Sequence, residues 1–263
     1  MHGMALSWLS KILSSLLFST LVGLTVLLVL SSTVLSSSYV TGKMDQTNAY
    51  EKLSQALSEE VAKKAEVADP AVQKQVAKII TPAVLKEKIT TTLSQLEDYY
   101  KHGGNAPVLD LTDLVAQART AGLEVPEHSQ LEKPIVFGGG QDHGSGSVGL
   151  AQRVLIITAS VLAFLLAILC WRRRTVVPFA NLAIALGGFL LFIGLLVWLL
   201  PGLVDANLQL GTASNAVAVI AHDIVFTIAR DIGKDFVFIG LGVAALGLGG
   251  RIAIAKLRRP HRA

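Results

Sequence analysis

The sequence predicts an all-α, polytopic membrane protein with four transmembrane helices and a helical extracytoplasmic domain inserted between the first and the second. Hydrophobic residues make up 52% of the 263 positions and the mean hydropathy is +0.55, which excludes an ordinary soluble domain. Four apolar runs are long enough to cross a bilayer. All 19 acidic residues lie between Asp45 and Asp142 or between Asp205 and Asp235, so charged and apolar segments alternate.

Basic residues that flank the runs predict the orientation. Lys11, the cluster Arg172–Arg174 and the C-terminal tail carry positive charge with no acid beside them, and such short segments stay in the cytoplasm. Because spans alternate in direction, the three segments agree. The predicted order is a cytoplasmic N-terminus (1–11), a first span (12–35), an extracytoplasmic domain (36–149) with a Gly-rich linker (138–149), a second span (150–171), a cytoplasmic basic loop (172–177), a third span (178–200), an extracytoplasmic segment (201–235), a fourth span (236–255) and a cytoplasmic tail (256–263).

The first span is expected to be an uncleaved signal anchor, because it is long for the apolar region of a cleaved signal peptide. Cleavage near Ser36–Ser38 is the alternative. Cys170 is the lone cysteine, and no Asn-x-Ser/Thr acceptor occurs in the sequence. Both features favour a bacterial plasma membrane.

Caps and helical periodicity divide the predicted extracytoplasmic domain into helices. An apolar stripe from Tyr50 to Val61 marks the first. Asp69–Pro70 and Thr81–Pro82 each combine an N-cap with a first-turn proline, and the second pair opens a helix that ends at Gly103–Gly104. A shorter helix is expected over 110–121. No alternating pattern of useful length predicts a strand, so the domain is expected to be all-helical.

The segment before the fourth span is predicted to form a charged amphipathic helix over 212–235 that runs unbroken into the span. Its apolar side is expected to pack against the outward extension of the first span. A helix lying flat on the outer leaflet is the alternative. The predicted apolar stripe consists of Ala221, Val225, Ile228 and Ile232.

Two groups of candidate site residues follow from the pattern. A polar patch near the outer interface, which lipid headgroups or the domain could contact and which ordinary surface charge explains equally well, consists of His222, Asp223, Arg230, Asp231 and Lys234. Glycines spaced by seven residues in the third and fourth spans put smooth seams on the helices for close packing; they are Gly187, Gly194, Gly240, Gly242, Gly247 and Gly249.

Several kinds of chemistry are not expected. The spans lack the carboxylates that pumps and secondary transporters need. The histidines outside the spans lack the spacing of metal ligands, so no metal, cofactor or catalytic residue is predicted. The net charge of +4 is split between a mixed-charge domain and basic tails, which does not indicate nucleic acid.

The leading hypothesis is a non-catalytic integral membrane protein whose extracytoplasmic helical domain binds a protein, an envelope component or a lipid. A second is an accessory or scaffold subunit of a membrane transport or envelope complex, docked through its glycine seams. A third is a membrane enzyme acting on lipid through the polar patch. The expected partners are membrane lipid and another membrane or envelope protein, and the sequence leaves a homo-oligomer open.

Overall fold

The computed structural model describes residues 2–64, 77–121, 133–137, 145–172, 176–208 and 216–257. This part of the chain is mostly helical, with one pair of short strands. It divides into two compact units, each described here by itself. The apolar unit comprises Met1–Leu30, Leu150–Val204 and Ala229–Ala263, and the polar unit comprises Ser31–Gly149 and Asp205–Ile228.

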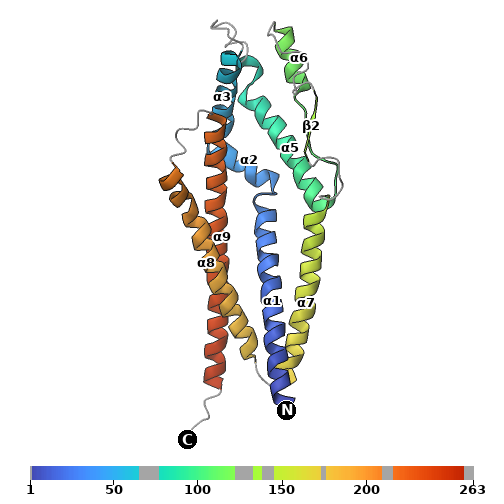
Figure 1. Ribbon diagram of the computed structural model, residues 1–263, viewed down its shortest axis with the longest axis vertical. Helices are drawn as coiled ribbons and strands as arrows, with labels where there is room; N and C mark the ends of the chain where they lie inside the picture. Colours follow the sequence, from blue (N-terminus) through green and yellow to red (C-terminus); the bar gives the residue numbers. More distant parts are fainter. Residues whose placement is uncertain are drawn as a thin grey trace. The chain divides into compact units, whose positions relative to one another are not determined.

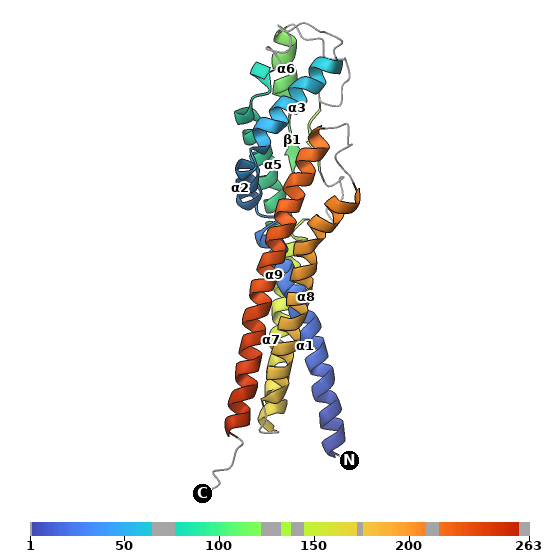
Figure 2. The ribbon, with the colours of Figure 1, turned by 90° about the vertical axis from the view of Figure 1, so that its left-hand side faces the viewer.

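Figure 1 labels most of the elements, and Figure 2 shows them from the side. In chain order they are α1 (His2–Ser32), α2 (Ser37–Gln46), α3 (Ala49–Lys64), α5 (Pro82–His102), β1 (Val108–Leu109), α6 (Thr112–Thr120), β2 (Ile135–Val136), α7 (Ser147–Arg172), α8 (Val177–Leu208) and α9 (Ala216–Leu257).

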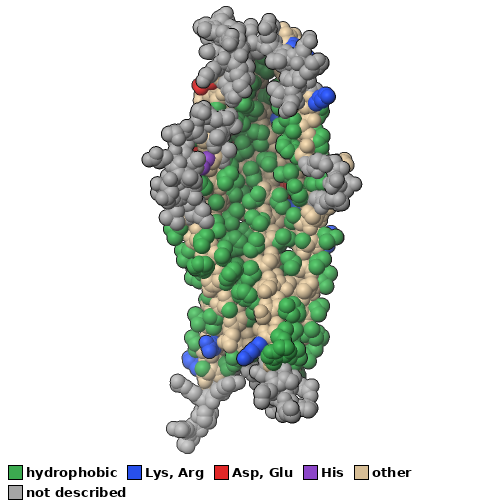
Figure 3. Space-filling model, in the orientation of Figure 1, with side chains coloured by type: hydrophobic (Ala, Val, Ile, Leu, Met, Phe, Trp, Pro, Cys, Tyr) green, Lys and Arg blue, Asp and Glu red, His purple; other side chains and the backbone are tan. Residues whose placement is uncertain are grey.

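Four of the helices are long and apolar enough to cross a membrane, which agrees with a multi-pass membrane protein. Hydrophobic side chains cover much of the visible surface of the apolar unit (Figure 3). In a bilayer such side chains contact lipid, whereas the helices satisfy their own backbone hydrogen bonds. The apolar segments are Trp8–Ser32, Ser147–Trp171, Val177–Leu199 and His222–Lys256.

Three of the four helices of the apolar unit share a buried cluster. α1 contributes Leu17, α8 contributes Leu182, and α7 contributes Ala159, Leu166 and Cys170. In addition, an aromatic ring of α1 meets one of α8 edge-on, with 5.7 Å between the centroids of Phe18 and Phe189. The amino end of α1, the carboxyl end of α7 and the carboxyl end of α9 lie at the same end of this unit (Figures 1 and 2).

Three helix boundaries differ from the prediction. α1 ends at Ser32 instead of 35, because Ser36 caps a new helix by accepting a hydrogen bond from a first-turn N–H. α2 is therefore a helix separate from α1. α8 does not end at 200 but passes through Pro201 and ends at Leu208. A proline removes one backbone hydrogen bond, and a long helix tolerates that loss. α7 begins at Ser147, inside the predicted linker.

The polar unit packs around a small apolar core. Helices α2, α3 and α5 contact one another in pairs, and Leu53, Leu57 and Ile89 are packed against the buried residues. Removal of these side chains from water is the main driving force available to a unit of this kind. The buried residues are Met44, Ala49, Tyr50, Ala56, Leu85 and Ile220.

α9 is a single helix of 42 residues, as predicted for the segment that runs into the fourth span. Near its start, Ile220 is buried in the core of the polar unit and Ile224 packs against it. Of the two predicted alternatives, packing or lying flat on a leaflet, this is the packed one. Ile232 of the predicted stripe is buried, but Val225 is 60% exposed and Ile224, one position earlier, packs against the core instead. A shift of one position turns a helix face by about 100°.

The caps predicted for α5 are confirmed. The Thr81 side chain accepts a hydrogen bond from the backbone N–H of Val84, and proline occupies the first turn. Gly103 ends the helix in the left-handed region, with φ of 83°, where glycine has no side chain to clash. α6 falls within the predicted 110–121. The helix expected at Asp69–Pro70 and the centre of the Gly-rich linker lie outside the described residues.

The expectation of a purely helical domain is wrong in one detail, because β1 and β2 form an antiparallel pair. Val108 is opposite Val136 and Leu109 is opposite Ile135. Each strand has two residues, which is too short to show the alternating pattern that identifies strands in a sequence.

Candidate functional site

The polar patch predicted on α9 is divided between the two units. His222 and Asp223 belong to the polar unit. The His222 ring meets the Phe226 ring edge-on at 3.9 Å between centroids. Its Nδ1 lies 3.8 Å from the Asp223 carboxylate, which is too far for a hydrogen bond. The Asp223 carboxylate also lies 4.0 Å from the ammonium of Lys52 on α3, and both side chains are half exposed.

The other three members of the patch belong to the apolar unit. The ammonium of Lys234 lies 3.2 Å from the Asp231 carboxylate one turn earlier, and Arg230 is exposed. These are ordinary neighbours on one helix surface. Among the residues that the structure describes, no group of three or more His, Cys, Asp and Glu could hold a metal ion.

Five glycines of the apolar unit lie where α8 and α9 touch, and the two helices run side by side in both ribbon views (Figures 1 and 2). A Cβ added to Gly187 would lie 2.6 Å from the carbonyl oxygen of Gly240. A Cβ added to Gly194 would lie 2.8 Å from the carbonyl oxygen of Gly233. Gly247 faces the α8 backbone in the same way. Two seven-residue spacings on antiparallel helices therefore meet glycine to glycine, and Gly233 is a member that was not predicted.

The remaining two predicted glycines have a different environment. A Cβ added to Gly242 or to Gly249 would meet nothing within 4 Å. The side chains of Phe238 and Leu246 nearby on α9 are 71% and 78% exposed. This second seam of α9 therefore faces away from α8 and is open within the described chain.

A clasp built on Glu97 joins α5 to the start of α2 in the polar unit. One carboxylate oxygen accepts hydrogen bonds from the backbone N–H and the hydroxyl of Ser37, at 2.9 and 2.8 Å. The other accepts from the ammonium of Lys101 at 2.8 Å. Burial alone would raise the pKa of Glu97, but these hydrogen bonds outweigh it and lower the pKa to about 2. Glu97 thus supplies a negative charge at the amino end of α2, where a helix favours one.

The strand β2 and the residue that follows it expose three consecutive apolar side chains. Ile135, Val136 and Phe137 are 37%, 54% and 41% exposed. The N–H of Phe137 donates to the carbonyl of Pro107 at 2.9 Å, so Phe137 faces the neighbouring strand. Because successive residues of a strand point their backbone groups to opposite edges, the N–H and C=O of Val136 point away from β1. No other strand among the described residues pairs with this outer edge.

Sequence reasoning missed two features of the polar unit, the Glu97 clasp and the strand β2. Glu97 lacks a sequence signal, since its partner Ser37 lies 60 positions away. The run Ile135–Phe137 was visible as an apolar segment before the glycines, but not as a strand. Comparison of the chain with protein-family models, with curated proteins and with solved structures finds no match.

Proposed function

We propose that the chain is a non-catalytic membrane protein whose polar unit lies outside the cytoplasm and binds an extended segment of a partner protein along the outer edge of β2. The single observation that carries the proposal is the exposure of Ile135–Phe137 at that edge. Apolar side chains in contact with water are unfavourable, and a free strand edge offers backbone donors and acceptors to another chain.

The chemistry of the edge indicates the kind of partner. Val136 presents one outward N–H and one outward C=O, which can pair with the backbone of an added strand. The side chains of the run would then give the added strand an apolar surface. An extended apolar peptide segment satisfies both requirements, whereas a lipid has no backbone amide to pair with this edge.

The outward position of the polar unit is supported by the charge pattern. Fifteen of the 19 acidic residues lie between Asp45 and Asp142, within the polar unit. The sequence before Asp45 and the tail after the fourth span contain basic residues and no acidic residue. Basic segments are retained in the cytoplasm, and with four alternating spans this supports an acidic segment on the other side.

Val136→Pro tests the proposal directly, because proline lacks only the N–H that faces away from β1. A photoreactive phenylalanine analogue at position 137 would be introduced in cells that produce the full chain. We expect ultraviolet light to give a discrete adduct with a protein, identified by mass spectrometry. The same adduct should be lost with Val136→Pro and retained with the matched control Val136→Ala.

Folding controls separate binding from misfolding. Val136→Pro and Val136→Ala should unfold within about 0.5 kcal/mol of each other, because neither removes a bond between β1 and β2. Phe137→Pro should be less stable, since it removes the donor to Pro107. Adducts with lipid alone, the absence of an adduct, or equal adducts in the proline and alanine variants would contradict the proposal.

A second candidate function is supported by the open glycines Gly242 and Gly249. A smooth face in a span permits close approach of another transmembrane helix, as expected of an accessory subunit. Gly242→Leu should then release a copurifying membrane protein in mild detergent. Gly188→Leu is the matched control, because a Cβ at Gly188 also meets nothing within 4 Å. Equal copurification with both variants would exclude this role for the α9 face.

A further inference from the structure

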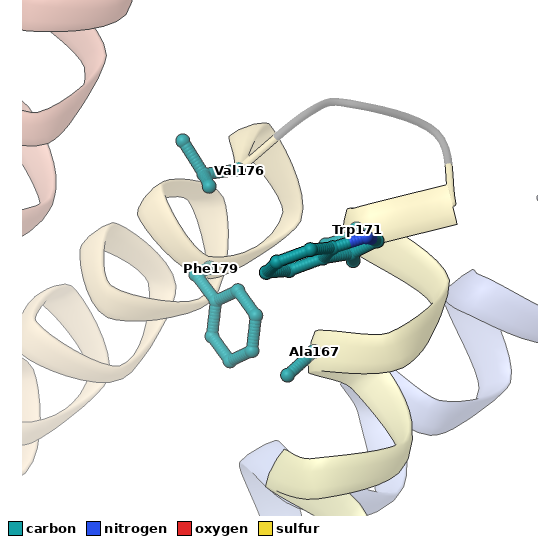
Figure 4. Close-up of a pocket in the computed structure, with 5 residues that line it drawn as sticks. Ala167, Trp171, Val176 and Phe179 are labelled. Atoms are coloured by element: carbon teal, nitrogen blue, oxygen red, sulfur yellow. The ribbon is translucent and has the colours of Figure 1, made fainter.

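One recess in the apolar unit lies between the carboxyl end of α7 and the start of α8. Its volume is about 600 Å³, within the range of about 300–1,000 Å³ that is usual for small-molecule sites. Figure 4 shows Trp171 extending from α7 toward the start of α8, with Ala167 below it on α7. The lining is mostly apolar and consists of Ala167, Cys170, Trp171, Val176 and Phe179.

The residues around the recess indicate which part of a bilayer it would open to. Ala167 and Trp171 lie at the end of the span Ser147–Trp171, and Phe179 lies at the beginning of the span Val177–Leu199. The Trp171 side chain is 87% exposed. Tryptophan at the end of a span marks the level of the lipid headgroups. The medium that reaches the recess from the side is therefore the acyl-chain region just below the headgroups.

The charge at this end of the unit is positive. Lys11 near the start of α1, and Arg251 and Lys256 near the end of α9, are exposed, and Lys and Arg side chains gather at this end in Figure 3. The acidic residues of α9 that belong to the apolar unit, Asp231 and Asp235, lie about six to seven turns before its carboxyl end. Basic side chains at this end would bind an anionic lipid headgroup more tightly than a neutral one.

We propose that the recess binds one acyl chain of an anionic glycerophospholipid, whose phosphate lies among the basic side chains at this end of the unit. The proposal does not depend on β2 or on a protein partner, because it uses only residues of the apolar unit. It assigns a positioning role to Trp171, whose ring forms one wall of the recess and lies at headgroup depth.

Native mass spectrometry of the full chain in detergent tests the proposal with two lipids of identical acyl chains. Phosphatidylglycerol is anionic, and phosphatidylcholine has no net charge. We expect one phosphatidylglycerol to be retained per chain in preference to phosphatidylcholine. Ala167→Phe fills the recess and should weaken retention about tenfold, the size typical of a blocked apolar anchor.

Two matched controls are available on the same unit. Ala253→Phe adds the same ring to an exposed position of α9 and should leave retention unchanged. Trp171→Ala should weaken retention without loss of fold, because the side chain is almost fully exposed. Its control is Trp8→Ala, which removes another exposed tryptophan that does not line the recess and should leave retention unchanged. Equal retention of the two lipids, or equal effects of the recess variants and their controls, would overturn the proposal.

Discussion

The two units of this chain are held together by different contacts. In the apolar unit, α8 and α9 meet backbone to backbone through facing glycines. In the polar unit, α2, α3 and α5 enclose an apolar core, and polar clasps such as Glu97 with Ser37 fix the helix ends. The apolar unit is thus held by close backbone contacts at glycines, whereas the polar unit is held by buried apolar side chains.

The difference follows from the solvent that each unit is built for. Lipid is as apolar as leucine, so burial of leucine between spans gains little, and close van der Waals contact of small residues takes its place. Water makes burial of Met44, Tyr50 and Leu85 favourable. It also competes for every polar contact, so a clasp must combine several hydrogen bonds to contribute.

The largest effect should come from Gly240→Leu, which would break one of the close backbone contacts between α8 and α9 in the apolar unit. A Cβ at this position would lie 2.7 Å from the N of Leu191 and 2.8 Å from the O of Gly187, so the helices must separate. We expect a loss of about 3 kcal/mol in thermal unfolding in detergent, the upper part of the usual range for overpacking. Gly242→Leu, on the open face, should change unfolding by much less.

Glu97→Gln should produce the next largest effect and should reveal the polar clasp. The lowering of the pKa from 4.5 to about 2 corresponds to about 3 kcal/mol, and exposure of 27% of the side chain reduces the expected loss to about 2 kcal/mol. Glu87→Gln, on the exposed side of the same helix, is the control.

The pH dependence of the same variant has a definite sign. Because the pKa of Glu97 is lower in the folded protein, its contribution is complete above pH 4.5 and is lost as the pH falls toward 2. The difference in unfolding free energy between the wild type and Glu97→Gln should therefore shrink over this interval. A difference that stays constant from pH 6 to pH 3 would exclude the ionised clasp.

A smaller effect is expected from the amino end of α5. Thr81→Ala removes the side-chain oxygen that accepts from the N–H of Val84 and should cost about 1 kcal/mol. Thr81→Ser keeps the cap and should restore most of the stability. Chemical unfolding of the two variants distinguishes a lost cap from a lost methyl group.

The smallest effect should be at the predicted polar patch. Asp223 and Lys52 are 4.0 Å apart and half exposed, and such surface pairs contribute less than about 0.5 kcal/mol. Asp223→Asn should therefore leave the unfolding temperature nearly unchanged. A large loss would show that this pair holds α9 to α3 more strongly than its geometry indicates.

The spans, the caps of α5 and the continuity of α9 could be predicted because each has a local cause. A run of apolar residues, a Thr–Pro pair or a glycine acts within a few positions of itself. The seven-residue glycine spacing was also visible, but the sequence could not show that Gly240 faces α8 while Gly242 does not. That distinction depends on how α9 is rotated against its neighbour.

The rest depends on contacts between distant positions. Glu97 and Ser37 become partners only after α5 and α2 have packed, and β2 becomes a strand only because β1 lies beside it. Near the start of α9 the predicted stripe contained Val225 where Ile224 meets the core, because the two side chains are similarly apolar. Hydrophobicity alone does not identify which of two adjacent apolar stripes meets the core.

The account depends most on the polar unit lying in water outside the cytoplasm while the ends of the chain lie inside. Two single variants test this with a membrane-impermeant maleimide, and the native chain is the control because Cys170 is buried. Gln117→Cys, on the exposed side of α6, should be labelled on intact cells. Lys256→Cys should be labelled only after the membrane is permeabilised. Labelling of position 256 on intact cells with protection of position 117 would contradict the account.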